Sequence, residues 1–296
     1  MNERAALSLV GGLVDHAGDD AAVVDGTVVT TDMLHDRTDF PAGTTRYTAG
    51  WRAVGASLSD VAATGAEATG AVAVYAAPDF EESELREFLQ GATDVCEAVG
   101  AEYVGGDLDT HQEFTVATTA LGRTDDPVGR SGAEPGDRLC VTGALGRSGA
   151  ALRLFEASET DRANELFRFE PRVAAGLALA EHATAMMDSS DGLARSCHQL
   201  TEASEVGLAL DGDAVPVDSA VHDVAADEAT VRELAWYFGE DFELVCTVPE
   251  HAVEDARADC PVPLSVVGEV TDGDDGDLAV SIDGEALPDR GFTHGE

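Results

Sequence analysis

The first 123 residues alternate between helical and strand-like hydrophobic spacing. Arg46–Thr64 carries large apolar residues every three or four positions in a run of small residues, which predicts a long helix. Ala21–Val24 and Val28–Thr31 are short apolar runs on either side of Asp25-Gly26, a dipeptide favoured in β-hairpins. The other elements expected in this half are helices over Glu3–Asp15 and Glu81–Val99 and strands over Ala71–Ala76, Glu102–Val104 and Phe114–Leu121.

A stretch rich in Asp, Gly and Pro, Thr124–Asp137, interrupts this pattern and predicts a boundary between domains 1–127 and 128–296. Helices and strands alternate again beyond it, so we expect an α/β (α+β) fold with two lobes. The Asp/Gly-rich stretch Asp272–Asp277 is typical of a turn or flexible loop. The expected strands are Arg138–Thr142, Ala185–Met187, Val206–Leu210, Phe242–Val248 and Leu264–Val270, and the expected helices are Gly146–Ala157, Arg172–His182, Leu193–Ala203 and His251–Ala258.

The charge is extreme: 58 Asp and Glu stand against 17 basic residues, all of them Arg, which gives a net charge of −41. Such a chain repels itself in dilute salt. At about 1 M salt the Debye length falls to roughly 3 Å, which screens that repulsion. Because the charge is spread along the chain and 44% of the residues are hydrophobic, the composition indicates a folded protein from a halophile. With no basic patch, neither nucleic acid nor an anionic membrane is an expected partner.

The five cysteines show neither a CxxC pair nor the spacing of a zinc site. This pattern favours buried free thiols in a reducing compartment, and therefore a cytoplasmic location. No signal peptide is recognisable, and no apolar run approaches the length of a membrane span.

Six short acidic motifs stand among Gly, Ala, Ser and Thr. A carboxylate on a tight turn of small residues is a good ligand for a hard cation and lets a large anion approach the backbone. Six such motifs together predict a site that holds phosphates through several Mg²⁺ ions. The motifs are GDDAAV (Gly18–Val23), TTDML (Thr30–Leu34), SLSDVAATGA (Ser57–Ala66), VGGDLDT (Val104–Thr110), DSSDGLARS (Asp188–Ser196) and GEDFEL (Gly239–Leu244).

The first three motifs belong to the predicted hairpin and the long helix. Because the first two flank the hairpin, Asp20 and Asp32 can lie close together, with hydroxyls such as Thr30 and Thr31 beside them. The simpler alternative is a pair of turn aspartates. Asp60 lies on a helix face of small residues that suits either a ligand or a close-packed interface.

The other three motifs are expected at strand ends. Gly105-Gly106 can expose backbone N–H groups to a phosphate with Asp107 on a metal, although a plain turn has the same sequence. DSSDG is the most specific motif, because it stands before a helix N-terminus, where unpaired N–H groups favour phosphate. A capping segment is its alternative, and GEDFEL is also compatible with a turn.

Several nucleotide-binding motifs are absent. A Walker GxxxxGK[ST] loop and the protein-kinase set both need a lysine, and the chain has none. A GxSxG nucleophile motif is absent as well. Phosphate charge must therefore be met by metal ions, arginine and backbone N–H groups.

In these motifs the chain resembles the thiamine-monophosphate kinase family of the aminoimidazole-ribonucleotide-synthetase-like superfamily, in a haloarchaeal form. The six motifs and RSGAEPGDRLCVTGALG (Arg130–Gly146) occur in the family's order over nearly the whole chain. The resemblance implies ATP-dependent phosphorylation of thiamine monophosphate to thiamine diphosphate. It also implies a synthetase-like fold, in which an N-terminal mixed-sheet lobe binds ATP and Mg²⁺ and forms a homodimer, and a C-terminal α/β lobe completes the site.

The resemblance also implies roles for individual residues. Gly106, Asp107, Arg130 and Ser190 correspond to ATP contacts, and Glu240 corresponds to a thiamine contact. Asp60, Asp32 and Asp191 carry the catalytic role, in which several Mg²⁺ ions neutralise both phosphates for direct in-line transfer. The implied Mg²⁺ ligands are Asp20, Thr30, Thr31, Asp32, Asp60, Asp107, Asp188 and Asp191.

Two substrate positions depart from the family. Asp39 stands where the family has a substrate-contacting His, and Asp289 aligns with a Trp that covers the substrate. Phe292 and Trp51 are candidates to replace that cover. The alternatives are a sister ATP-dependent synthetase of the superfamily, which usually carries a Lys or an early reactive Cys, and a non-catalytic halophilic cation-binding protein.

Overall fold

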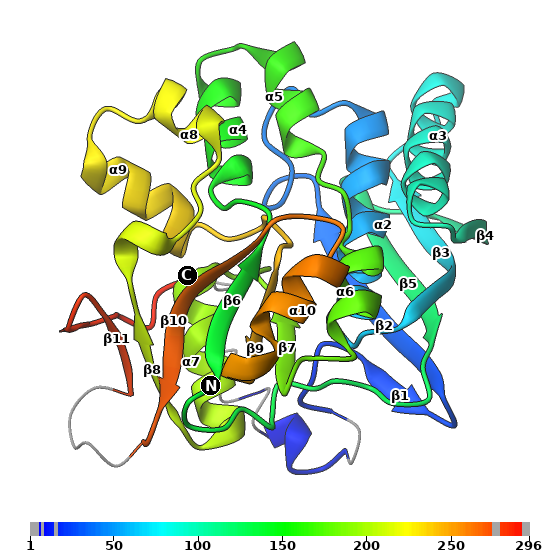
Figure 1. Ribbon diagram of the computed structural model, residues 1–296. Helices are drawn as coiled ribbons and strands as arrows, with labels where there is room; N and C mark the ends of the chain where they lie inside the picture. Colours follow the sequence, from blue (N-terminus) through cyan, green and yellow to red (C-terminus); the bar gives the residue numbers. More distant parts are fainter. Residues whose placement is uncertain (1–5, 7–8, 15–16, 274–278, 292–296) are drawn as a thin grey trace.

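The computed structural model describes residues 6, 9–14, 17–273 and 279–291, and these form two lobes that each contain one mixed sheet (Figure 1). The N-terminal sheet has the strand order β1-β2-β5-β3-β4. Helix α2 (Arg46–Ala63) packs against β2, β3, β5 and α3 (Glu82–Ala98). The strands are β1 (Ala22–Val24), β2 (Thr27–His35), β3 (Glu67–Ala77), β4 (Glu102–Thr110) and β5 (Thr115–Arg123).

The C-terminal sheet has the strand order β12-β11-β8-β10-β6-β9-β7. Its strands are β6 (Arg138–Thr142), β7 (Ala185–Asp188), β8 (Gly207–Leu210), β9 (Leu244–Val248), β10 (Leu264–Thr271), β11 (Val280–Ile282) and β12 (Glu285–Ala286). Its helices are α4 (Arg147–Glu156), α5 (Thr160–Phe167), α6 (Val173–Leu179), α7 (Leu193–Ser204), α8 (Ser219–Val224), α9 (Glu228–Arg232) and α10 (Val253–Asp259), with a π-helical turn at Glu233–Tyr237 and short 3₁₀ turns at Gly212–Ala214 and Glu250–Ala252.

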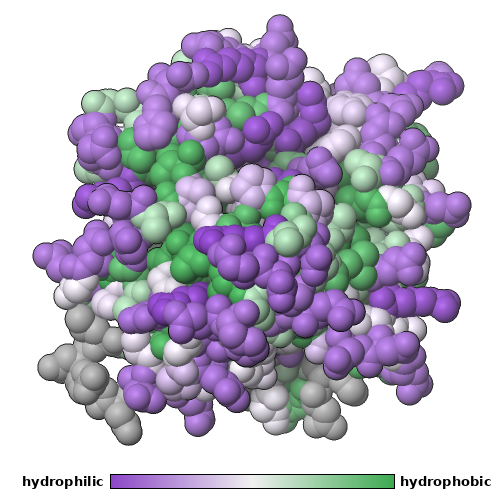
Figure 2. All heavy atoms as spheres, viewed as in Figure 1, coloured by the Kyte–Doolittle hydropathy of each residue, from purple (hydrophilic) through white to green (hydrophobic). Residues whose placement is uncertain are grey.

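Hydrophilic residues cover most of the face drawn in Figure 2, with apolar residues showing between them. This is the surface expected of a chain with 58 acidic residues. Among the described residues, none of the helices combines the length and the hydropathy needed to cross a membrane.

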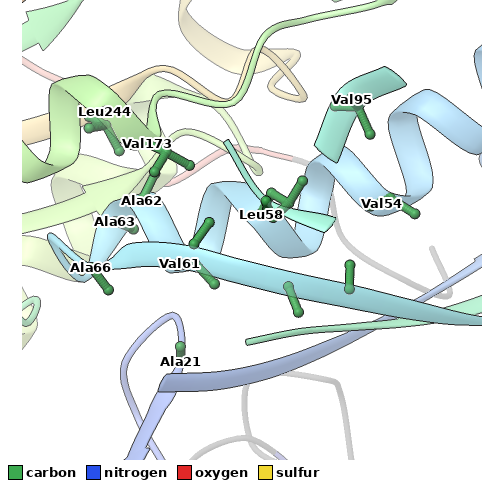
Figure 3. Packing of buried hydrophobic residues seen from close by; sticks show 14 of the residues in the cluster. Ala21, Val54, Leu58, Val61, Ala62, Ala63, Ala66, Val95, Val173 and Leu244 are labelled. Carbon is green, nitrogen blue, oxygen red and sulfur yellow. The ribbon is translucent and has the colours of Figure 1, made fainter. Parts of the chain in front are cut away.

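Helix α2 forms the centre of the molecule, because its small residues let both lobes pack against it. Leu58 and Val61 are completely buried, and Ala62 and Ala63 share one cluster with Val173 of the C-terminal lobe (Figure 3). A Cβ on Gly176 of α6 would lie 2.1 Å from the Ala62 carbonyl oxygen, so only glycine allows this approach. The small-residue motif of α2 therefore serves lobe packing as well as the site.

The structure confirms the two-lobed mixed α/β architecture, the long central helix and the hairpin. Val24 pairs with Thr27 across a two-residue loop, and Asp25 and Gly26 have φ angles of 51° and 74°. Both angles are positive, as a type I′ turn requires, which is why Asp-Gly favours this connection.

Several expectations differ from the structure. Gly105-Gly106 does not end a strand, because β4 continues to Thr110 and pairs with β3 beyond a register shift. Helices α5, α8 and α9 were not expected, since each has at most 8 residues, which is too short for a helical period to be recognised in the sequence. Residues 6 and 9–11 of the expected first helix are helical. Residues 12–14 are described and are not helical, whereas residues 3–5, 7–8 and 15 lie outside the described residues, as do residues 274–277 and Phe292.

Candidate active site

Three carboxylates from separate elements meet where the two lobes join. Asp20 lies just before β1, Asp60 lies in the last turn of α2, and Asp188 ends β7. Each offers one oxygen, and these oxygens all lie within 4.8 Å of one another. Carboxylate oxygens at this spacing suit a hard divalent cation such as Mg²⁺. The fold thus brings together three of the metal ligands expected from the sequence.

The local geometry of α2 explains why Asp60 reaches both lobes. Successive helix residues are about 100° apart around the axis, so Asp60 faces between the directions of Ser57 and Ser59. Ser57 Oγ donates to Asp32 Oδ2 at 2.6 Å, and Ser59 Oγ donates to Asp188 Oδ2 at 2.7 Å. The serines of the SLSD motif therefore orient one carboxylate of each lobe beside Asp60.

Strand β2 and the linker between the lobes supply the remaining contacts. Thr30 Oγ1 donates to Asp60 Oδ2. Arg130 donates from Nη2 and Nε to the two oxygens of Asp20, at 2.9 and 3.2 Å, and its backbone N–H donates to Asp19 Oδ1 at 2.7 Å. A two-point contact of this kind fixes both the position and the orientation of a carboxylate. Arg130 also supplies positive charge beside the acidic cluster.

Burial and the closeness of the carboxylates raise the pKa values of several of them. Burial is the largest cause that raises the pKa of Asp60 well above its usual value, and the charges of Asp32, Asp188 and Asp20 raise it further. Burial, followed by the charge of Asp20, raises the pKa of Asp188 to about 7. Burial also raises the pKa of Asp32, against the opposing hydrogen bond from Ser57. Such a cluster gains stability when cations replace its protons.

We expect the metal-free protein to lose stability as the pH rises from about 5 to about 8, at constant high KCl. The folded-state pKa of Asp188 is about 7, above an unfolded value of about 3.9. Between these values the folded state binds more protons than the unfolded state, so raising the pH favours unfolding. Thermal unfolding in chelator and in Mg²⁺ checks this, because Mg²⁺ should flatten the decline. An Asp188→Asn variant should also show a shallower decline in chelator, and an unchanged slope in it would contradict the assignment.

Two turns of the C-terminal lobe, those of DSSDG and GEDFEL, are hydrogen-bonded to each other beside the acidic cluster. The Glu240 N–H donates to the Ser190 carbonyl oxygen at 2.7 Å, which joins GEDFEL to DSSDG. A Cβ on Gly239 would lie 2.6 Å from the backbone of Ser190 and Asp191, so glycine is required here. The Ser190 N–H donates to Asp188 Oδ1 at 3.3 Å, and half-buried Asp191 follows in the same turn. Asp188, Ser190, Asp191 and Glu240 thus form one continuous rim.

Two of the expected ligands point away from the cluster within one chain. Thr31 neighbours Thr30 on β2, so their side chains lie on opposite faces of the sheet, and the exposed Thr31 hydroxyl donates to the Thr118 carbonyl oxygen at 2.7 Å. Asp107 lies on β4, three strand spacings or roughly 14 Å from β2. It is level with exposed Val74 and therefore on the outer face of the sheet, while Gly106 lies beside Ala73. The fold of a single chain does not bring Asp107 to Asp60.

Asp39 and Asp289, the two positions expected to differ from the family, each contact residues of this chain. Asp39 is 8% exposed, and its Oδ2 accepts from the His35 N–H at 2.7 Å and from Thr38 Oγ1 at 2.8 Å. Asp289 forms an ion pair with Arg195 of α7 at 2.6 Å. The carboxylate of Asp39 stabilises its own loop, and that of Asp289 ties the C-terminal segment to the helix behind DSSDG.

Four residues that hold the site residues in place were not predicted from the sequence: Ser57, Ser59, Arg52 and Asp241. Ser57 and Ser59 belong to the motif SLSDVAATGA, and their spacing around Asp60 was a usable signal. Arg52 gave none, because a single Arg in a helix looks like a surface residue, and Asp241 stands in GEDFEL, which was also compatible with a plain turn. In the structure both are buried, at 4% and 6% exposure.

Comparison with known proteins covers the whole chain. Residues 18–124 match the family described as AIR synthase related protein, N-terminal domain, and residues 134–281 match AIR synthase related protein, C-terminal domain. Thiamine-monophosphate kinase of Halobacterium salinarum is 65% identical over 294 residues, with 99% of this chain and 100% of the relative covered. That of Methanospirillum hungatei is 38% identical over 303 residues, with 99% of each covered.

A solved structure, AaThiL complexed with AMPPCP and TMP, has the same fold. The TM-score is 0.87 at 26% identity, with 99% of this chain and 97% of the other covered. The likeness therefore extends through both lobes and the junction where the acidic cluster lies.

Proposed function

The chain belongs to the AIR synthase related family, and we propose that within it this protein transfers the terminal phosphoryl group of ATP to thiamine monophosphate, forming thiamine diphosphate. The observation that carries this proposal is the meeting of Asp20, Asp60 and Asp188 in a chain 65% identical to a thiamine-monophosphate kinase along its whole length. The related structure with AMPPCP, an ATP analogue, together with TMP supports both substrates.

The three carboxylates fit a Mg²⁺ ion, and we propose that the site holds several such ions. Asp20, Asp60 and Asp188 would hold the metal, with Asp32, Asp191 and Thr30 beside them. Bound Mg²⁺ would neutralise the two phosphate groups and align them for in-line transfer. Ser57 and Ser59 hold Asp32 and Asp188 in the orientation that this requires. Arg130 fixes Asp20 and places positive charge where ATP phosphates would lie.

The acceptor is itself a phosphate oxygen, which is anionic near neutral pH. Transfer therefore needs no general base, and the task of the protein is to bring two polyanions together. Helix α7 begins directly behind the turn Asp188–Asp191, and its first backbone N–H groups, which have no side-chain cap, are in a position that favours phosphate. Glu240, joined to this turn, would meet the cationic thiamine end of the acceptor.

A homodimer would also account for Asp107. The outer face of the N-terminal sheet exposes Met33 (55%), Val74 (40%) and Leu121 (38%) in a chain of net charge −41. An apolar face on so acidic a protein favours burial against a second copy. Because Asp107 lies level with Val74 on this face, it would face the partner in such a dimer, and we propose that it serves the site of the partner rather than that of its own chain. We place the enzyme in the cytoplasm, a location supported by five buried free cysteines.

We expect purified protein in high KCl with Mg²⁺ to release ADP from ATP when thiamine monophosphate is supplied. Thiamine itself should give less than about 1% of that rate, because it lacks the phosphate oxygen that attacks. A coupled ADP assay with product identification as thiamine diphosphate measures this. ADP release with other phosphorylated acceptors alone would instead favour a sister synthetase, and cation binding without turnover would favour a non-catalytic role.

A further inference from the structure

Arg52 is a buried cation between the two lobes. It lies on α2, its side chain is 5% exposed, and its Nη2 donates to Glu240 Oε2 at 3.1 Å. Nη1 donates to Ser148 Oγ at 3.2 Å and to the Phe167 carbonyl oxygen. The guanidinium carbon lies 3.5 Å from the centre of the Phe167 ring, so the group is held by stacking as well as by hydrogen bonds.

The backbone of Glu240 is held as firmly as its side chain. Its N–H donates to the Ser190 carbonyl oxygen at 2.7 Å, and its carbonyl oxygen accepts from Ser148 Oγ at 2.6 Å. Glu240 and Phe242 both have positive φ angles, 57° and 55°, which non-glycine residues adopt rarely. The residue between them, Asp241, accepts from the N–H groups of Gly146 and Ser148 at the start of α4. The side chain of Glu240 is 21% exposed and reaches solvent.

The placement of Arg52 along α2 connects this arrangement to the acidic cluster. Arg52 precedes Asp60 by eight residues, a rise of about 12 Å along the helix. One rigid helix therefore carries the expected metal ligand Asp60 in its last turn and the partner of Glu240 near its middle. The helix would thereby fix the distance between the phosphate contact at Asp60 and the contact for the cationic end at Glu240. A substrate that spans both contacts would have to match this distance.

A buried ion pair adds little net stability, because the desolvation of both charges offsets their attraction. The benefit of Arg52 is therefore geometric: the planar fork of its guanidinium fixes one carboxylate oxygen of Glu240. Lysine would provide the charge without that fork.

We infer that Arg52 is a positioning residue for the acceptor: it holds the Glu240 carboxylate at the angle that receives the cationic thiamine end of thiamine monophosphate. The inference rests on the proposed function, since Glu240 is assigned as the acceptor contact there. The hydrogen bonds described for Arg52 go to Glu240, Ser148 and Phe167, whereas ATP would bind through the acidic cluster and Arg130. Loss of Arg52 should therefore weaken the binding of thiamine monophosphate and leave the binding of ATP intact.

The test compares steady-state constants of Arg52→Gln and Arg52→Lys with the wild type. We expect the KM for thiamine monophosphate to rise about 10–100-fold in Arg52→Gln and less in Arg52→Lys, with the KM for ATP changed less than about twofold. Arg168→Gln is the matched control, because Arg168, which directly follows α5, also contacts α2: it donates to Thr48 Oγ1 at 3.1 Å and lies over the Tyr47 ring. It should leave the acceptor KM within about twofold of wild type.

A double-mutant cycle with Glu240→Gln separates positioning from a purely structural role. If Arg52 acts through Glu240, Arg52→Gln adds less than about a twofold further loss in the Glu240→Gln background. Additive losses, or equal changes in both KM values, would overturn the inference, and Arg52→Lys decides the matter if Arg52→Gln does not fold. A wild-type protein without thiamine monophosphate turnover would refute the proposed function itself.

Discussion

Replacing Asp60 with Asn is expected to lower turnover at saturating substrates by about 10³-fold, which corresponds to roughly 4 kcal/mol of transition-state stabilisation. Asp60 faces Asp20 and Asp188 at once, and its oxygen is within 4.8 Å of an oxygen of each. Asn keeps the shape of the side chain but removes the negative charge that would hold divalent cations between the two phosphates. Thr30 can still donate to the remaining carbonyl oxygen of the side chain.

The same substitution should stabilise the metal-free protein. The charges of Asp32, Asp188 and Asp20 all raise the pKa of Asp60, which means that its ionised form is repelled by each of them. Removing that repulsion favours the folded state, and each kcal/mol gained raises the melting temperature by roughly 2–4 °C in a protein of this size. Melting curves in chelator and in Mg²⁺ measure this, since the variant should gain in the first and lose the response to Mg²⁺.

Asp255→Asn provides the control, because Asp255 is an exposed acid of α10 and the substitution removes the same charge. It should change neither turnover nor the response to Mg²⁺. Near-normal turnover of Asp60→Asn would refute the metal assignment. A variant that loses turnover and also melts at a lower temperature in chelator would show that Asp60 supports the fold instead.

The sequence predicted elements wherever local pattern decides the structure. The period of α2 and the Asp25-Gly26 turn need no distant partner, and both agree with the structure. The path of β4 depends on its pairing with β3, a long-range contact, so Gly105-Gly106 was wrongly placed at the end of a strand. The short helices α8 and α9 are likewise held by packing rather than by their own periodicity.

The site was predictable only in part, for a related reason. In a chain with 58 acidic residues, charge does not distinguish a metal ligand from a solvated surface acid. The motifs selected Asp20, Asp60 and Asp188, and the fold places them together. Alternation along β2 separates Thr31 from Thr30, and the sheet order separates Asp107 from Asp32. Motif resemblance names residues without saying which face, or which copy of the chain, presents them.

A heterodimer of Asp60→Asn with Asp107→Asn should recover about half of wild-type turnover, although each variant alone should lose nearly all of it. If Asp107 serves the site of the partner, one site of the heterodimer carries both substitutions and the other carries neither. We propose this arrangement because Asp107 lies on the outer face of the sheet, roughly 14 Å from β2 of its own chain. Co-expression with two affinity tags isolates the heterodimer for the ADP assay.

The matched control is a heterodimer of Asp60→Asn with Asp188→Asn. Both residues belong to the same cluster within one chain, so each site of this heterodimer carries one substitution and neither site recovers. Recovery in the first heterodimer alone places Asp107 across the interface, and the same experiment tests whether the apolar face with Met33 and Val74 is where the copies meet. No recovery in either heterodimer, from dimers shown to be intact, would mean that Asp107 serves its own chain or has no part in the reaction.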